Sequence, residues 1–225
     1  MQTQTAGAQQ DAGARFLAWA EKHRTQLGLG AAAVAVLAGS IWFVGEYQQR
    51  KGAAASTALQ TARTAVRSGN LPLAASDLTR LIGSYRGTGA SDEAVILLAQ
   101  VRLLQAQPDV AAQELQAAIG RGIGDQFRGP AFGLLGSALE NVGEWQQAGN
   151  AYEDAASASW YAFLSSQYLV DAARAYAIAA DTARAISAYE RILSEYGEST
   201  GSAEARLRLA ELQATQASST ASARE

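Results

Sequence analysis

The sequence predicts an all-α protein in which a single N-terminal transmembrane helix precedes an α-solenoid of about four helix hairpins and a capping helix. Three observations in the 225-residue chain lead to this fold class. Residues 25–45 form a run of 21 residues without a charge. Residues 132–155 carry apolar and small side chains at the spacing of two helices that meet at Gly143. The small residues of that helix pair recur every 37 residues.

Residues 1–26 are expected to combine a polar tail with a short segment that lies on a membrane surface. Residues 1–13 are polar or small, which is typical of disorder. Phe16, Leu17 and Trp19 then stand among basic residues, which is the composition of an interfacial segment.

Residues 27–45 are predicted to form the transmembrane helix. The uncharged run that contains them matches the ~20 residues that a helix needs to cross a bilayer. Trp42 and Tyr47 stand near one end and Trp19 near the other, where aromatic residues favour the membrane interface. The alternatives are a buried core helix and a signal peptide cleaved near 53–55. The charged lead and the long apolar run favour an uncleaved anchor.

One side of the predicted span is built from small residues, which would allow close packing against another transmembrane helix. These residues are Gly28, Ala31, Ala32, Ala35 and Gly39. A weakly hydrophobic anchor that tolerates alanine and glycine is an equal alternative.

Basic residues stand on both sides of the span, so the positive-inside count does not decide its orientation. The short N-terminal tail favours a signal anchor, which would leave the tail in the cytoplasm and place the repeats across the membrane. Residues 46–52 then form a connector. Gly52 is the only interruption expected before the first repeat helix.

Residues 132–155 form the clearest helix hairpin. Gly136 on the first helix and Ala148 on the second have almost no side chain, so we expect the two backbones to approach closely there. Tyr152 fills part of the remaining space, and Gly143 gives the backbone freedom that a tight turn needs. A hairpin of this kind cannot bury its apolar face alone, which predicts neighbouring hairpins.

The same unit recurs with a fixed period. In the first helix of each unit the recurring small residues are Ala62, Ala99, Gly136 and Ala173, and in the turn they are Gly69, Ala106, Gly143 and Ala180. In the second helix they are Ala74, Ala111, Ala148 and Ala185. Four residues after these second-helix positions stand, in the same order, the larger residues Leu78, Leu115, Tyr152 and Tyr189. One period over four units of helix and turn predicts a solenoid.

The repeat domain is expected to occupy residues 53–217. In chain order its segments are a first hairpin at 53–67 and 71–85, a second unit from 91, a glycine-rich loop at 120–130, the third unit at 132–155, the fourth at 162–196 and a capping helix at 200–216. Residues 218–225 are expected to be a disordered tail.

The sequence carries no pattern of catalytic, cofactor-binding or metal-binding residues. It has no cysteine, and its one histidine, His23, stands next to the predicted span. The acidic pairs at 92–93 and 153–154 suit solvent-exposed helix faces. We therefore expect no enzyme activity, no cofactor and no metal site. A net charge of −3 argues against a general nucleic-acid-binding protein.

The third unit closely resembles a tetratricopeptide repeat. The residues that match the signature of that family are Phe132, Leu135, Gly136, Leu139, Gly143, Trp145, Ala148, Tyr152 and Ala155. The family's closing proline is replaced by Trp160 in unit three and by Gly197 in unit four. The period also exceeds the usual 34 residues. We therefore expect divergent repeats with slightly longer links.

The tetratricopeptide resemblance implies a peptide-binding groove lined by the first helix of each unit. The matching polar positions in this chain are Gln100, Ser137, Glu140, Asn141, Gln167 and Arg174.

The layout of one span, a short connector and repeats from residue 53 resembles the YfgM family. Those are single-pass proteins of the bacterial inner membrane with a periplasmic tetratricopeptide-like domain. The resemblance implies translocon and chaperone partners, in addition to the lipid bilayer around the span. An interaction adaptor is therefore the first functional hypothesis. The alternative is a structural accessory subunit of a large membrane assembly, such as a bioenergetic complex, packed through its small-sided span.

Overall fold

The computed structural model of the chain describes residues 22 and 24–222, with side chains for 22, 39–40 and 42–214. The chain divides into two compact units, Met1–Lys51 and Gly52–Glu225. The polar tail and the interfacial residues Phe16, Leu17 and Trp19 lie outside the described residues.

Helix α2 runs from Arg24 to Arg67 without a break. It contains the residues predicted as the span, the connector at 46–52 and the first repeat helix, and Gly52 does not interrupt it.

Within the part of the chain that the structure describes, no helix combines the length and apolarity needed to span a membrane. The transmembrane helix predicted at 27–45 therefore finds no support in the structure, and the side chains of 27–38 and 41 lie outside the described ones. Of the predicted small face, Gly39 is exposed, and a Cβ added there would have no neighbour within 4 Å. Gly28, Ala31, Ala32 and Ala35 are among the residues without described side chains.

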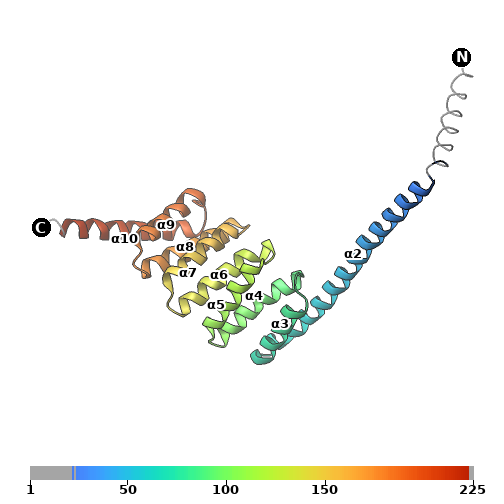
Figure 1. The fold of residues 1–225 in the computed structure, drawn as a ribbon. Helices are drawn as coiled ribbons and strands as arrows, with labels where there is room; N and C mark the ends of the chain where they lie inside the picture. Colours follow the sequence, from blue (N-terminus) through green and yellow to red (C-terminus); the bar gives the residue numbers. More distant parts are fainter. Residues whose placement is uncertain (1–21, 23, 223–225) are drawn as a thin grey trace, which may run out of the picture. The chain divides into compact units, whose positions relative to one another are not determined.

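The second unit consists of helix hairpins that follow one another in chain order (Figure 1). After α2, the helices are α3 (Leu71–Ser84), α4 (Gly89–Leu104), α5 (Pro108–Arg121), α6 (Asp125–Asn141), α7 (Trp145–Ala158), α8 (Ala162–Ile178), α9 (Thr182–Glu195) and α10 (Gly201–Ser222). This arrangement confirms the predicted all-α solenoid and its hairpin order.

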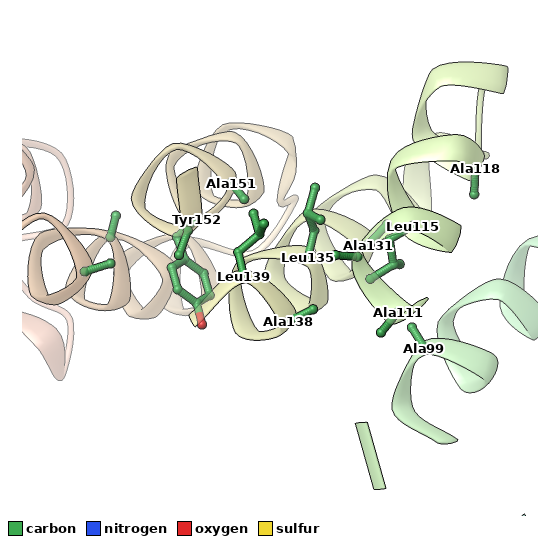
Figure 2. Packing of buried hydrophobic residues seen from close by; sticks show 14 of the residues in the cluster. Ala99, Ala111, Leu115, Ala118, Ala131, Leu135, Ala138, Leu139, Ala151 and Tyr152 are labelled. Atoms are coloured by element: carbon green, nitrogen blue, oxygen red, sulfur yellow. The ribbon is translucent and has the colours of Figure 1, made fainter. Parts of the chain in front are cut away.

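The helix residues that recur every 37 positions are buried in the core, whereas the recurring turn residues Gly69, Ala106 and Gly143 are exposed. Ala74, Ala111, Ala148 and Ala185 are all fully buried, and the residues four positions later are also buried. Small residues allow neighbouring helices to approach, and the larger side chains fill the space that remains. Figure 2 shows this packing continuing from Ala99 on α4 through Leu115 and Leu135 to Tyr152 on α7.

The four turns within the units have the same backbone conformation. Gly69, Ala106, Gly143 and Ala180 have φ angles of 74°, 55°, 83° and 62°. In each turn, the amide of the next residue donates to the carbonyl five residues before it, as from Asp181 N to Tyr176 O at 2.9 Å. This bond closes a left-handed helix C-cap, which favours glycine. Two of the four turns therefore place alanine in a conformation that costs it about 1 kcal/mol.

Replacing Ala180 by glycine is expected to raise the free energy of unfolding by about 1 kcal/mol, because glycine adopts a positive φ without steric strain. Gly143→Ala is the matched reversal and should lose a similar amount. Urea denaturation followed by helical circular dichroism measures both. A lower midpoint for Ala180→Gly than for the unmodified chain would contradict the strain at this turn.

The break before the third unit is shorter than the predicted loop at 120–130. Residues 120–121 end α5, and α6 already begins at Asp125, so only residues 122–124 separate the helices. Pro130 lies inside α6. As the sixth residue of the helix, Pro130 cannot donate to the Gln126 carbonyl, and its ring crowds that carbonyl, yet the helix continues on both sides of it.

Helix α10 packs against α9 and α8 and covers the end of the last repeat. Ala205 on this helix is fully buried, while Arg206, Arg208 and Glu211 are exposed. The helix continues to Ser222, so residues 218–222 are helical rather than part of a disordered tail. The sequence from 203 to 222 contains neither glycine nor proline to end the helix.

Candidate interaction surface

The first helices of the units form one layer of the repeat domain, and the second helices form another. Helix α4 contacts α6, and α8 contacts α10. Helices α5 and α7 each contact the first helix of their own unit and that of the next. The residues predicted to line a groove stand on α4, α6 and α8, so they belong to the first-helix layer.

An ion pair joins two first helices within this layer. Arg174 Nη2 on α8 donates to Glu140 Oε1 on α6 at 2.9 Å and to Asp171 Oδ1 at 3.3 Å. The Arg174 side chain is 52% exposed, whereas those of Glu140 and Asp171 are 17% and 26% exposed. The two carboxylates are thus largely shielded, and the guanidinium group that bridges them remains accessible to a partner.

Two further side chains complete the α6–α8 polar network, which consists of Glu140, Tyr152, Gln167, Asp171 and Arg174. The Tyr152 hydroxyl donates to Glu140, and Gln167 hydrogen-bonds Asp171. Burial raises the pKa of Tyr152 far above its usual value, and the charges of Glu140 and Asp171 add to this shift. The hydroxyl therefore remains a donor at any physiological pH.

The pKa of Asp171 is raised above its usual value, mainly by burial, while Arg174 opposes the shift and Glu140 adds to it. The hydrogen bond from Gln167 also lowers this pKa. The network thus contains two acidic groups and one guanidinium, which leaves it able to accept additional hydrogen bonds or positive charge.

The remaining predicted groove residues lie outside this network. Asn141 Nδ2 donates to the Ser137 carbonyl of its own helix at 2.8 Å. Asn141 and Gln100 are exposed, and Ser137 is half-buried. These three side chains make the surface polar without joining one helix to another.

Sequence reasoning did not identify Asp171 as part of the surface, nor the buried Tyr152 as a neighbour of its charges. Asp171 stands three residues before Arg174, a spacing at which helical side chains can pair. Tyr152 was interpreted only as a core residue. Arg63, at the same repeat position as Arg174, also pairs across helices, to Glu93 on α4. An interhelical arginine–carboxylate pair therefore occurs at both ends of the first-helix layer.

A hollow of about 330 Å³ extends the surface from α8 to α10. Arg174, Tyr189, Glu204 and Arg208 contribute to its lining. It adds charged groups of both signs next to the α6–α8 polar network.

No group of three or more acidic or histidine side chains within the described residues could hold a metal ion. The polar groups of the surface are carboxylates, amides, hydroxyls and a guanidinium. Such groups recognise peptides by hydrogen bonds and charge pairs.

The fold of the chain is similar to that of solved helical-repeat proteins. One is a crystal structure from Podosopora anserina of nearly identical TPR-like repeats assigned to a kinesin light chain. The similarity has a TM-score of 0.55 at 15% sequence identity and covers 72% of this chain and 87% of that one. A single-residue variant of the same protein gives a TM-score of 0.54 at 16% identity, over 72% and 86% of the two chains. At this identity the likeness shows the fold alone.

The family described as tetratricopeptide repeat-like domain matches residues 10–162. The match includes residues 27–45 as well as the first three units. No curated protein matches the chain.

Proposed function

Because the chain belongs to the tetratricopeptide repeat-like domain family, we propose that it is a membrane-anchored scaffold that binds other proteins through its first-helix layer. The observation that carries this proposal is the bridge from Arg174 to Glu140. It holds an accessible guanidinium between two helices of a rigid repeat scaffold. A side chain that is already held in one conformation loses little conformational entropy when a partner binds.

Anchoring is proposed from the 21 uncharged residues at 25–45. The end of this run and the residues just after it expose the large apolar side chains of Trp42, Phe43, Val44 and Tyr47, which a lipid interface would accommodate. The family match begins at residue 10, before this segment, so the segment and the first repeats belong to one family domain. This supports an anchor that is part of the same domain as the repeats.

The proposed location is the bacterial inner membrane, with the repeats in the periplasm. This proposal rests on the resemblance of the layout to the YfgM family. The same resemblance suggests partners from the translocon or from periplasmic chaperones.

A structural subunit of a large membrane assembly is the second candidate. It is favoured by the small residues of the predicted span; at one of them, Gly39, an added Cβ would meet no side chain or other helix within 4 Å among the described residues. A helix that offers such a face can pack closely on another membrane helix. In this case the span, rather than the first-helix layer, would hold the protein in its complex.

Co-purification of partners with matched variants distinguishes the two candidates. The groove variant combines Gln100→Ala, Asn141→Ala and Gln167→Ala, three exposed residues of the first-helix layer. Arg174 is left intact, because removing it would leave Glu140 and Asp171 without their shared cation and would destabilise the fold. The control variant combines Gln113→Ala and Gln116→Ala, two exposed residues of the second helix α5. The span variant combines Ala35→Leu and Gly39→Leu.

The full chain should stay in the membrane pellet after an alkaline wash and be extracted only by detergent.

The groove variant should recover at least tenfold less partner than the unmodified chain, because hydrogen bonds in a desolvated groove carry much of the specificity. The control and span variants should retain the partner. Loss of the partner with the span variant alone would instead identify a structural subunit.

A further inference from the structure

The link between α7 and α8 and the first turn of α8 together expose three aromatic side chains within four residues. Trp160, Tyr161 and Phe163 are 71%, 62% and 64% exposed. The rings of Tyr161 and Phe163 lie 6.0 Å apart and are tilted against each other. Large aromatic groups gathered on an exposed surface are typical of a binding site.

The fold holds this link in a fixed position beside α6. Gly129 on α6 lies so close to Ser159 that a Cβ added to it would be 3.3 Å from the Ser159 Cα. Tyr161 N donates to Ser159 Oγ at 3.3 Å, and Ser165 Oγ donates to Ala156 O at 2.9 Å. The aromatic residues therefore stand on a defined turn next to the start of α6.

Trp160 borders a hollow of about 370 Å³ between the start of α6 and the end of α7. Asp125, Arg128 and Phe132 of α6 and Asp154 of α7 also line it. Arg128 Nη1 lies 3.9 Å from Asp125 Oδ1. The hollow thus combines two carboxylates and one guanidinium with aromatic walls, which gives it an excess of negative charge.

Asp154 carries the uncompensated part of this charge. Among the described residues it has no hydrogen-bond or ion-pair partner, although the charge of Arg128 acts on it. Asp154 is exposed, but partial desolvation by the surrounding protein raises its pKa; the neighbouring Glu153 adds to the shift, and Arg128 opposes it. A bound cation would stabilise this carboxylate.

We propose that the hollow is a second binding site, which takes an arginine side chain from an apolar segment of a protein partner. A guanidinium group can stack on the Trp160 ring and pair with the Asp154 carboxylate at the same time. Apolar neighbours of that arginine would lie on Tyr161 and Phe163. A membrane surface fits less well, because anionic lipid headgroups would repel Asp125 and Asp154.

The test measures binding of a fluorescent peptide to the detergent-solubilised full chain. The probe is a ten-residue glycine–serine peptide with a central leucine–arginine–leucine. Its control replaces the arginine by citrulline, which keeps the shape and removes the charge. We expect the citrulline peptide to bind at least tenfold more weakly.

Two protein variants should weaken binding of the arginine peptide at least tenfold. They are Asp154→Asn, which removes the charge, and Trp160→Ala, which removes an exposed ring that the core does not need. Asp109→Asn, at an exposed aspartate on α5, is the matched control and should bind normally. The groove variant described above should also bind normally, which separates this site from the proposed function of the first-helix layer.

Equal binding of the two peptides would overturn the proposal, because the site would then be an apolar patch without selectivity for a cation. Unchanged affinity in both Asp154→Asn and Trp160→Ala would overturn it as well. Self-association of the chain that is lost in Trp160→Ala, with no peptide binding, would assign the surface to a second copy of the protein instead.

Discussion

Replacing Gly136 by leucine is expected to destabilise the repeat domain by about 3 kcal/mol, because the space above Gly136 is already filled. A Cβ at this position would lie 2.7 Å from Cδ1 and Cε1 of the Tyr152 ring. Tyr152 is buried between α6 and α7, so its ring has no free volume into which to move. The side chain that Gly136 accommodates is thus Tyr152, rather than Ala148 as the helix spacing alone suggested.

Urea denaturation of single and double variants tests this contact. Gly120→Leu is the matched control, since Gly120 is exposed near the end of α5 and a Cβ there would meet nothing within 4 Å. In a Tyr152→Ala background the cost of Gly136→Leu should fall to less than half, because the deleted ring leaves a cavity for the leucine. An unchanged cost in that background would show that another residue covers Gly136.

Gly149→Ala is expected to cost about 2 kcal/mol, although it adds only one methyl group. The new Cβ would overlap the ring of Tyr176, which is fully buried. The Tyr176 hydroxyl lies 2.9 Å from Asn150 Oδ1 and 2.8 Å from Glu153 Oε2, and its one proton is shared between these two acceptors. The Arg184 guanidinium lies 5.0 Å above the ring centroid. Contacts at the edge and face of the ring therefore oppose its displacement, and overpacking outweighs the gain in helix propensity.

The control for Gly149→Ala is Gly120→Ala, in which the new methyl group meets nothing within 4 Å. Alanine has the higher helix propensity, so this control should be stabilised by about 0.5 kcal/mol or more. Thermal unfolding followed by circular dichroism should therefore shift in opposite directions for the two variants. A higher midpoint for Gly149→Ala would mean that the Tyr176 ring can be displaced at little cost.

The period of 37 residues was sufficient to predict the solenoid and its turns. It identified Ala106 and Ala180 as turn residues although alanine is not a typical one, and both have positive φ angles. The prediction of the turns and crossings succeeded because both depend on the spacing of residues within one hairpin, and that spacing can be counted in the sequence. The predicted end of the capping helix at residue 216 was wrong, and α10 continues to Ser222. The tail contains no glycine or proline that would end the helix earlier.

The sequence placed Gln100, Glu140, Asn141 and Arg174 on first helices, but it did not show which of them interact. The bridge from Arg174 to Glu140 joins residues 34 positions apart. The approach of Trp160 to the start of α6 likewise depends on the close contact at Gly129.

The sequence by itself determined the all-α solenoid, the repeat unit and the small residues at which its helices cross. The transmembrane helix that it also predicted finds no support among the described residues. Only the tertiary structure decided that tyrosine rings pack on Gly136 and Gly149, that Arg174 bridges α6 and α8, and that Asp154 shares a hollow with Trp160. The physical reason is that helical periodicity fixes which face a side chain occupies. Its partner on another helix depends on the crossing angle and offset of the two helices, which the packing of the whole solenoid sets.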